Sequence, residues 1–460
     1  MAIQRYTELA VNRPEDLLFG HSPRPLSCGH GLTIGAGEVY PEINFTLPPM
    51  EVTEATLPAV REQYTAIVEA VCRRAVELHA PGLVVEFELL PPMTIHPDWG
   101  ESIVVILRSA LDRFHADAGL RSALRVTPTD IRDIQRPIHQ RSGPCWQAMR
   151  DSFRRCASAG ADLLSIESTG GKEVCDGALV QCDLQGVLFG LGVLGVRDMA
   201  FLWDAIGQAC EGTKCKPAGD TACGFANTAM VLADRHMIPR VFASVVRTVS
   251  AVRSLVAYER GAVGPSKDCA YEGPFLKAIT GLPISMEGKS AACAHLSPVG
   301  NIAAAAADLW SNESVQNVKL LSATAPVVSI EQLIYDCRLM NVALAEGPEA
   351  ARRLRDWLVR SDAALDPQAF VLTPENVVAL SRAMVTPKDA CERSWDVAAA
   401  TLSLLRTAAE RGELSLSDRE LHWLDMLDMQ LETAPRDEPS AVAAFNASAY
   451  PNLILSEYGL

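Results

Sequence analysis

The stretch Leu83-Val-Val-Glu-Phe-Glu-Leu-Leu90 combines β-branched and large apolar residues in a short run, which is typical of a strand in a parallel sheet. Apolar residues at helical spacing follow over Ser102–Ala118, and a second strand-like run follows over Leu124–Arg132. The order strand, helix, strand predicts a βα unit whose two strands lie parallel.

The same alternation continues along the chain. Further strand candidates are Asp162–Glu167, Asp198–Trp203, Lys216–Thr221, Leu255–Glu259, Pro283–Glu287 and Val318–Ala323, and helical patterns cover Gly143–Ala159, Thr228–Val256 and Gly288–Ser311. Eight strands within about 250 residues favour an α/β protein with a closed (β/α)8 TIM barrel. An open, doubly wound sheet is the alternative.

The strand signals divide the chain into three parts. Residues 1–80 contain a segment rich in Pro and Gly, His21–Met50, and a helical pattern, Leu57–His79, so we expect an N-terminal lid or skirt. Residues 81–328 form the predicted barrel. Residues 329–460 have helical patterns only, which predicts a helical C-terminal extension at a subunit interface.

Composition excludes several classes of protein. A formal net charge of −15 over 460 residues disfavours nucleic-acid binding. The first residues lack an apolar signal region, and the stretch Leu184–Val196 is too short to span a bilayer. Thirteen cysteines are an odd number for a disulfide framework, so we expect reduced thiols and a cytoplasmic protein without a membrane anchor.

The stretch Gly190-Leu-Gly192-Val-Leu-Gly195 matches the GxGxxG pattern of dinucleotide-binding turns. It lies inside an apolar run, and no acidic residue ends a second strand about twenty positions later. We therefore favour close packing of a buried helix over dinucleotide binding.

Polar residues follow several strand candidates, and in a barrel the active site lies at these carboxyl ends. The residues are Glu86, Glu88, Thr127, Asp130, Glu167, Asp220, Lys267, Asp268, Cys269 and Glu287. Glu167 is either a catalytic group, a metal ligand or the partner of Lys172 in a salt bridge, and the sequence alone does not decide between these roles.

Two cysteines, Cys223 and Cys269, also follow strand candidates. Cys210, Cys215 and Cys223 fall within fourteen residues, but their spacings match no compact metal motif well. Cys223 is the best placed, at a predicted helix start that favours a thiolate, although a buried structural thiol remains an alternative. Cys269 lies in a polar loop, where Lys267 favours and Asp268 opposes its thiolate form.

Motifs along the chain resemble those of the zinc-containing methanol:corrinoid methyltransferase subunits. The motifs are Phe19-Gly20, Leu32-Thr-Ile-Gly-Ala-Gly37, Ser165-Ile-Glu167-Ser-Thr-Gly-Gly-Lys172, Gly219-Asp-Thr-Ala-Cys223-Gly-Phe-Ala-Asn-Thr-Ala-Met230, Gly264-Pro-Ser-Lys-Asp-Cys269-Ala-Tyr-Glu-Gly-Pro274 and the segment 283–302.

This resemblance implies a TIM barrel, one zinc bound by Glu167, Cys223 and Cys269, and a partner protein that carries the corrinoid cobalamin. It also implies a dimeric core within a hetero-oligomer. Under this reading Cys175, Cys182, Cys210 and Cys215 are structural, whereas the role of Cys293 stays open.

The resemblance further implies that the methyl group of methanol moves to cobalt(I) of the corrinoid. Hydroxide is a poor leaving group, since the pKa of water is about 15.7, so a metal Lewis acid and a proton donor would both help. Candidate proton donors are Asp220, Asp268, Glu272, Glu287 and His295. The alternatives are another methyl donor such as a methoxylated aromatic, a barrel zinc hydrolase, or a non-catalytic subunit with buried cysteines.

Overall fold

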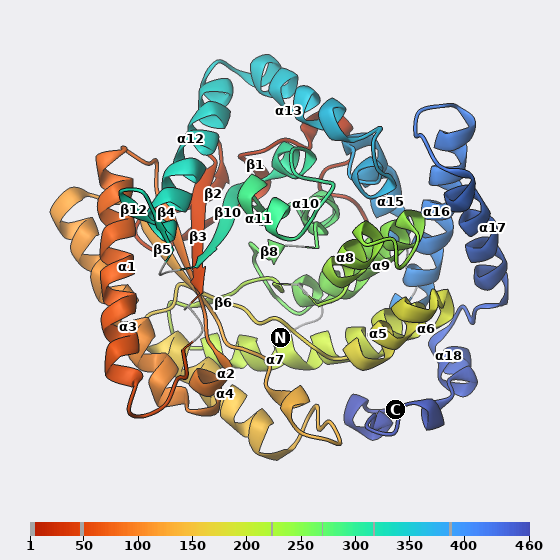
Figure 1. Ribbon diagram of the computed structural model, residues 1–460, viewed down its shortest axis with the longest axis horizontal. Helices are drawn as coiled ribbons and strands as arrows, with labels where there is room; N and C mark the ends of the chain where they lie inside the picture. The colour runs from red at the N-terminus through yellow and green to blue at the C-terminus, as the bar shows by residue number, and fades with distance from the viewer. Residues whose placement is uncertain (1–4, 47–49, 222–223, 269, 316–317, 386–388) are drawn as a thin grey trace.

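A computed structural model describes residues 5–46, 50–221, 224–268, 270–315, 318–385 and 389–460 (Figure 1). Eight parallel strands follow one another around a single sheet. They are β3 (Tyr40–Thr46), β4 (Leu83–Glu88), β5 (Ser122–Thr127), β6 (Leu163–Leu164), β7 (Lys216–Pro217), β8 (Lys267–Asp268), β9 (Ser285–Glu287) and β10 (Leu309–Val315).

Backbone hydrogen bonds close the sheet between its two end strands. The amide of Val263 donates to the carbonyl of Pro217 at 2.9 Å, and the amide of Gly219 donates to the carbonyl of Pro265 at 3.3 Å. Since β3 also pairs with β10, the strands run in chain order around a closed ring. The predicted (β/α)8 barrel is confirmed, and the open doubly wound sheet is excluded.

Helices surround the barrel in the order of the chain (Figure 1). The ring contains α1 (Leu57–Glu77), α3 (Pro97–Ala118), α4 (Gly143–Ser158), α7 (Val196–Cys210), α9 (Arg240–Glu259), α10 (Gly273–Thr280) and α12 (Ala325–Ala345). Helix α12 packs on β3, β10 and α1, which completes the ring. The barrel therefore begins at β3, inside the expected lid, and ends with α12, inside the expected extension.

Three of the eight strand predictions are wrong. Asp198–Trp203 lies within α7 and Leu255–Glu259 lies within α9, while Val318–Ala323 falls on a small hairpin of β11 (Lys319–Leu320) and β12 (Ala323–Thr324). Every residue of α9 after Arg240 is buried, so its short apolar runs have no polar face that would mark a helix. Three of the eight barrel strands, β3, β8 and β10, were not predicted.

Two of the four helical patterns match one helix each, and two do not. Ser102–Ala118 and Gly143–Ala159 match α3 and α4. The pattern over Thr228–Val256 covers two helices, α8 (Ala226–Asp234) and α9. The pattern over Gly288–Ser311 covers α11 (Lys289–Ala294), the 3-10 turn η4 (Ile302–Ala306) and the start of β10.

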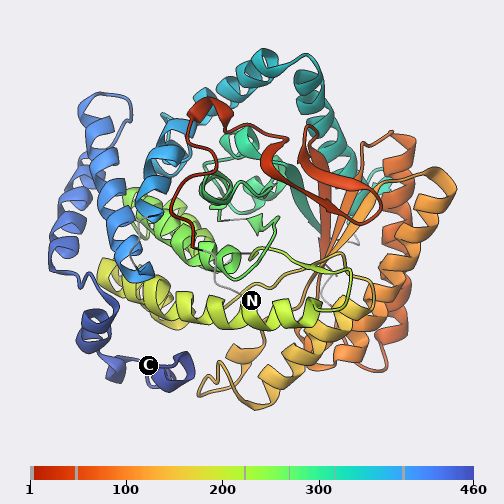
Figure 2. The ribbon, with the colours of Figure 1, turned by 180° about the vertical axis from the view of Figure 1, so that it is seen from behind.

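The N-terminal segment covers the end of the barrel at which the strands begin. This end lies opposite the mouth, which is formed by the carboxyl ends of the strands. Strands β1 (His21–Cys28) and β2 (Leu32–Ala36) form an antiparallel hairpin, which crosses the barrel in the rear view (Figure 2). Its apolar side chains pack against residues at the starts of the strands, Tyr40, Val84, Ala123, Leu163 and Leu309. Of the lid or skirt expected from the sequence, the hairpin therefore fits the skirt.

The remaining helices form a C-terminal layer on one side of the barrel (Figure 1). They are α13 (Pro348–Asp362), α14 (Pro367–Phe370), α15 (Pro374–Met384), α16 (Ala390–Glu410), α17 (Asp418–Thr433), α18 (Glu438–Ala444), and the 3-10 turns η5 (Ala447–Ala449) and η6 (Leu455–Tyr458). Helix α16 packs along α9, and the last residues return to the loops that follow β5 and β6.

The GxGxxG stretch forms η3, a π-helical segment (Gly190–Gly195) that joins α6 (Leu184–Phe189) to α7. An added Cβ would lie 3.1 Å from the backbone of Cys175 at Gly190, 2.8 Å from Ser394 at Gly192 and 2.9 Å from Arg253 at Gly195. All three glycines are thus positions of close packing, as the sequence predicted.

Two helical stretches, Leu184–Cys210 and Arg240–Glu259, are long and apolar enough to cross a bilayer by length and composition alone. Their most apolar windows are 72% and 100% buried inside the fold, as expected for core helices.

Candidate functional site

The barrel interior is polar at the middle of its strands, with Glu42 and Arg125 both fully buried. The guanidinium of Arg125 lies 2.9 Å from the Glu42 carboxylate, which also accepts a hydrogen bond from the hydroxyl of Ser285. Below this pair lies the apolar layer that the hairpin covers. Above it, towards the mouth, lie further charged side chains.

Lys267 on β8 is the centre of this upper cluster. Its ammonium lies 3.0 Å from Glu88 and 3.6 Å from Glu86, and it also donates a hydrogen bond to Glu313. Burial would lower the pKa of Lys267, but these carboxylates outweigh burial and hold it well above its usual value. Lys267 in turn lowers the pKa of Glu313.

Glu167 lies just beyond β6, and its backbone forms a parallel bridge with Thr129. Burial raises the pKa of its carboxyl to about 8, and the nearby carboxylates of Glu88 and Asp220 add to this effect. A carboxyl in such surroundings gains most from a cation that stabilises its charged form. Its surroundings therefore make Glu167 a candidate cation ligand.

The salt-bridge alternative for Glu167 is wrong. The ammonium of Lys172 lies 2.6 Å from the carboxylate of Asp176, one helical turn further along α5 (Lys172–Gln181). Lys172 therefore pairs with its own helix.

Cys223 and Cys269 lie outside the described residues, but residues next to them are described. A Cβ built on Gly224 would lie 3.9 Å from Oε1 of Glu167, so the chain directly after Cys223 passes close to this carboxylate. Asp268, directly before Cys269, ends β8 at the mouth of the barrel.

The candidate proton donors are placed differently. Asp220 is buried in an ion pair with Arg253 and accepts two hydrogen bonds from Ser168, so its oxygens are occupied. Glu272 is buried and accepts a hydrogen bond from Ser254. The side chain of Asp268 is outside the described part of the chain.

Glu287 and His295 do come together at the mouth, with Glu313 as a third member. One side-chain atom of each lies within 4.8 Å of the others, and His295 Nε2 is 3.8 Å from Glu287. The amide of Asn227 lies 2.8 Å from His295 Nδ1, and since an amide NH2 only donates, the proton of the neutral ring is on Nε2. Burial lowers the pKa of His295, which favours this neutral form.

Two carboxylates and an imidazole could also bind a cation. Here, however, Lys267 already balances the charge of Glu313, so proton exchange suits the group better. The sequence analysis missed Glu313 because the start of β10 was assigned to the helical pattern Gly288–Ser311 and the rest of it to no strand. The run Leu309-Trp-Ser-Asn-Glu-Ser-Val315 does not alternate apolar and polar residues, so periodicity gave no signal for this strand.

The other cysteines behave as structural thiols. Cys175, Cys182, Cys210 and Cys215 are all buried. Burial raises the pKa of Cys175 to about 12, and a hydrogen bond with Cys210 together with burial raises the pKa of Cys215. Cys293, on α11, is exposed.

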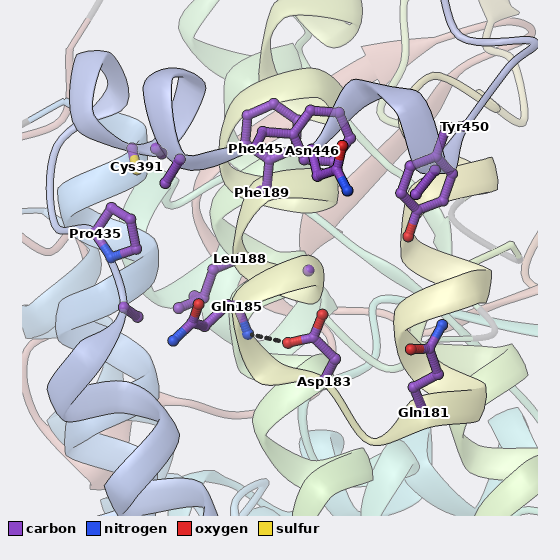
Figure 3. A pocket seen from close by; sticks show the side chains of 15 residues that line it. Gln181, Asp183, Gln185, Leu188, Phe189, Cys391, Pro435, Phe445, Asn446 and Tyr450 are labelled. Atoms are coloured by element: carbon purple, nitrogen blue, oxygen red, sulfur yellow. Dashed lines mark hydrogen bonds between the residues drawn. The ribbon is translucent and has the colours of Figure 1, made fainter.

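A cavity of about 280 Å³ lies outside the barrel, between α5, α6 and the C-terminal layer (Figure 3). Its lining includes Asp183, Gln185, Phe189, Phe445 and Tyr450, and the backbone N–H of Gln185 donates to the carboxylate of Asp183. None of the mouth residues that the structure describes lines it, so we place the functional site at the mouth.

Comparisons with known proteins agree on one family. A family model described as methanol-cobalamin methyltransferase B subunit matches residues 3–453. The methanol–corrinoid protein co-methyltransferase of Methanosarcina barkeri is 37% identical over 441 residues, which are 95% of this chain and 94% of that protein. A chain in the crystal structure of the methanol:cobalamin methyltransferase complex from Methanosarcina barkeri matches with a TM-score of 0.95 and 35% identity, over 99% of this chain and 100% of that chain.

Proposed function

Because this chain belongs to the methanol-cobalamin methyltransferase B subunit family, we propose that it transfers the methyl group of methanol to a corrinoid carried by a partner protein. The match extends over nearly the whole chain and the whole relative, so the activity concerns the entire fold.

We further propose that Glu167, Cys223 and Cys269 bind one catalytic zinc. The observation that carries this proposal is the close approach of the chain after Cys223 to Glu167, since a Cβ built on Gly224 would lie 3.9 Å from Oε1 of Glu167. Held by these three residues, zinc would supply Lewis-acid chemistry at the mouth, which would weaken the C–O bond of an alcohol.

The remaining residues of the mouth have separate tasks. Lys267 neutralises the carboxylates of Glu88 and Glu313, which limits the negative charge around the site. His295 and Glu287, whose contact at the mouth is 3.8 Å, would pass a proton towards a departing oxygen. The hairpin β1–β2 covers the opposite end of the barrel, so the mouth is the route for substrate and corrinoid.

The experiment that tests the function is a methyl-transfer assay with the full chain, the corrinoid partner and cobalt(I). We expect the cobalt(I) spectrum to change to that of methyl-cobalt(III) with methanol, and only when zinc is present. Turnover with a methoxylated aromatic but not with methanol would contradict the substrate. Hydrolysis without any corrinoid would support a zinc hydrolase instead.

We also propose a homodimeric core, which the outer face of α12 supports. Tyr335, Leu339 and Val342 recur at helical spacing and are 50%, 61% and 52% exposed, which is unusual for a row of large apolar side chains. Leu339→Glu combined with Val342→Glu is expected to halve the mass measured by light scattering without changing the circular dichroism. An unchanged mass, or a wild-type protein that is already a monomer, would contradict this interface.

A further inference from the structure

The loop that follows Glu167 is hydrogen-bonded to the buried carboxylate of Asp220, which lies just beyond β7. The amide of Ser168 donates to Oδ1 of Asp220 at 3.2 Å, and its hydroxyl donates to Oδ2 at 3.1 Å. The amide of Thr221 donates to the carbonyl of Ile166 at 3.2 Å. The residues on either side of Glu167 are thus bonded to the segment that leads to Cys223.

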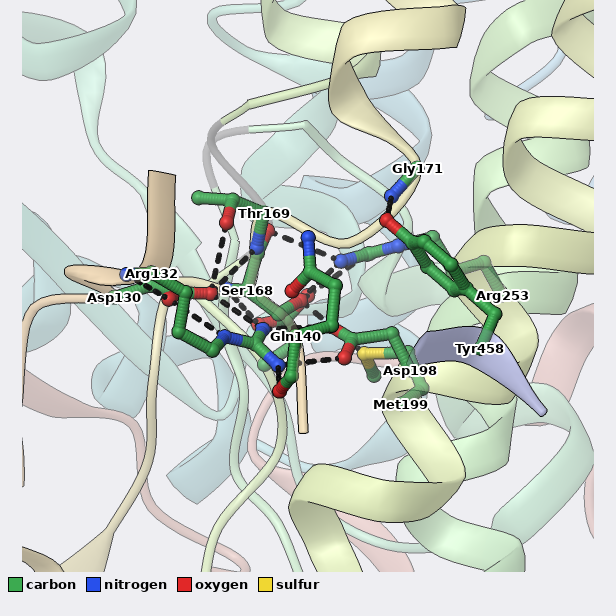
Figure 4. Close-up of polar contacts among 11 residues, drawn as sticks. Asp130, Arg132, Gln140, Ser168, Thr169, Gly171, Asp198, Met199, Arg253 and Tyr458 are labelled. Atoms are coloured by element: carbon green, nitrogen blue, oxygen red, sulfur yellow. Dashed lines mark hydrogen bonds and ion pairs between the residues drawn. The ribbon is translucent and has the colours of Figure 1, made fainter. Parts of the chain in front are cut away.

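Arg253 on α9 completes this arrangement (Figure 4). Its guanidinium lies 2.8 Å from Oδ2 of Asp220 and donates to both the carbonyl and the hydroxyl of Ser168. It also lies over the ring of Phe225, 4.1 Å from the ring centroid. Arg253 therefore contacts the chain on both sides of Cys223 as well as the loop after Glu167.

The GxGxxG stretch provides the space for Arg253. A Cβ on Gly195 would lie 2.9 Å from Cδ and 3.2 Å from Nε of Arg253. Any larger residue at this position would displace the arginine. The glycine pattern that resembles a dinucleotide motif thus has a role in building this network.

A second carboxylate holds the next residue of the loop (Figure 4). The amide and hydroxyl of Thr169 donate to Oδ2 of Asp130 at 3.0 and 2.9 Å. Arg132 bridges Asp130 and Asp198 with contacts of 2.6 and 2.7 Å. Burial would raise the pKa of Asp130, but Arg132 outweighs burial and lowers it, so this acceptor stays charged.

The segment near residue 458 reaches the same loop. The amide of Gly171 donates to the hydroxyl of Tyr458 at 3.0 Å. Hydrogen bonds at Ser168, Thr169 and Gly171 therefore restrict the conformation of this loop. Glu167 directly precedes Ser168.

We propose that Asp220, held by Arg253, is a positioning residue that sets the carboxylate of Glu167 and the chain leading to Cys223 relative to one another. This inference rests on the proposed zinc site, whose ligands these are. It replaces the expectation that Asp220 donates a proton, because both of its oxygens are engaged with Ser168 and Arg253.

The test is Asp220→Asn in the full-length chain, with zinc affinity measured by competition with a chelator. Residues that orient a metal ligand typically contribute about 10- to 100-fold in affinity, and we expect a loss in this range. Asp204→Asn is the matched control, since Asp204 lies on α7 and pairs at 3.1 Å with Arg260, away from the site. The control should keep the wild-type affinity.

Hydrogen exchange in the metal-free protein provides a readout that does not depend on zinc. The amides of Ser168 and Thr221 should exchange faster in Asp220→Asn than in the wild type or in Asp204→Asn. If Asp220→Asn does not fold, Ser168→Ala removes the hydroxyl contact but keeps the ion pair, and smaller changes in the same direction are expected.

Two results would overturn the proposal. Unchanged affinity and unchanged exchange in Asp220→Asn would remove the positioning role. Unchanged affinity with the loss of one limb of the pH profile of kcat would instead identify Asp220 as a proton donor. If the wild type itself bound no zinc, the proposed metal site would fail, whereas the exchange measurement would still decide whether Asp220 holds the loop.

Discussion

Glu167→Gln is expected to lose zinc and, with it, methyl transfer from methanol. The substitution keeps the shape of the side chain but removes the negative charge that a metal ligand supplies, in a position where burial already disfavours that charge. Since even residues behind the ligands contribute about 10- to 100-fold, loss of a ligand should weaken zinc binding by at least about 100-fold. Metal analysis after dialysis against a chelator measures this loss directly.

The control for this variant is Glu173→Gln, on the first turn of α5 and close to Glu167 in the sequence. It should retain about one zinc per chain, as a single catalytic site requires. Full zinc content and full activity in Glu167→Gln would refute the assignment of this residue as a ligand. Loss of zinc together with loss of the circular dichroism spectrum would indicate unfolding, and Glu167→Asp would then separate the two effects.

Lys267→Met is expected to destabilise the fold strongly. Its ammonium is fully buried and balances the fully buried Glu86 and the partly buried Glu88 and Glu313, so its removal leaves carboxylates in the barrel without a counter-charge. Breaking a buried ion pair in this way typically costs about 3–5 kcal/mol. Denaturant unfolding at neutral pH should show a lower midpoint by a corresponding amount.

The pH dependence of this variant follows from the same charges. Lys267 lowers the pKa of Glu313, so the stability from their pairing is present above the usual carboxyl pKa and is lost as the pH falls through the lowered value. The deficit of Lys267→Met should therefore shrink in acid. Lys289→Met, whose half-exposed ammonium lies 3.6 Å from Asp336, should change stability by less than about 1 kcal/mol. Equal deficits at neutral and acid pH would contradict the electrostatic explanation.

The fold could be predicted from the sequence because strands such as β4 and β5 are buried along almost their whole length and contain short apolar runs between helical patterns. Strands β3 and β10 escaped prediction because polar residues occupy their inner positions, including Glu42 and Glu313. A barrel with charges in its interior lacks the alternation of apolar residues on which strand prediction depends. The buried helix α9 produced the opposite error, since it has no polar face.

The candidate site could also be predicted only in part. The position of Glu167 beyond a strand end could be predicted, because β6 and the loop after it are close in sequence. The partners of Lys267 could not be predicted. Glu88 and Glu313 lie on strands that are distant in sequence and meet only when the barrel closes. For the same reason, the ion pair between Asp220 and Arg253, which are 33 residues apart, could not be predicted.

The central claim is that Glu167, Cys223 and Cys269 together bind the zinc that activates methanol. X-ray absorption at the zinc edge of the full chain tests it most directly. The account predicts two sulfur neighbours at about 2.3 Å and oxygen neighbours at about 2.0–2.2 Å, with one sulfur lost in each of Cys223→Ser and Cys269→Ser. A shell with no sulfur, or one that is unchanged in both variants, would contradict it.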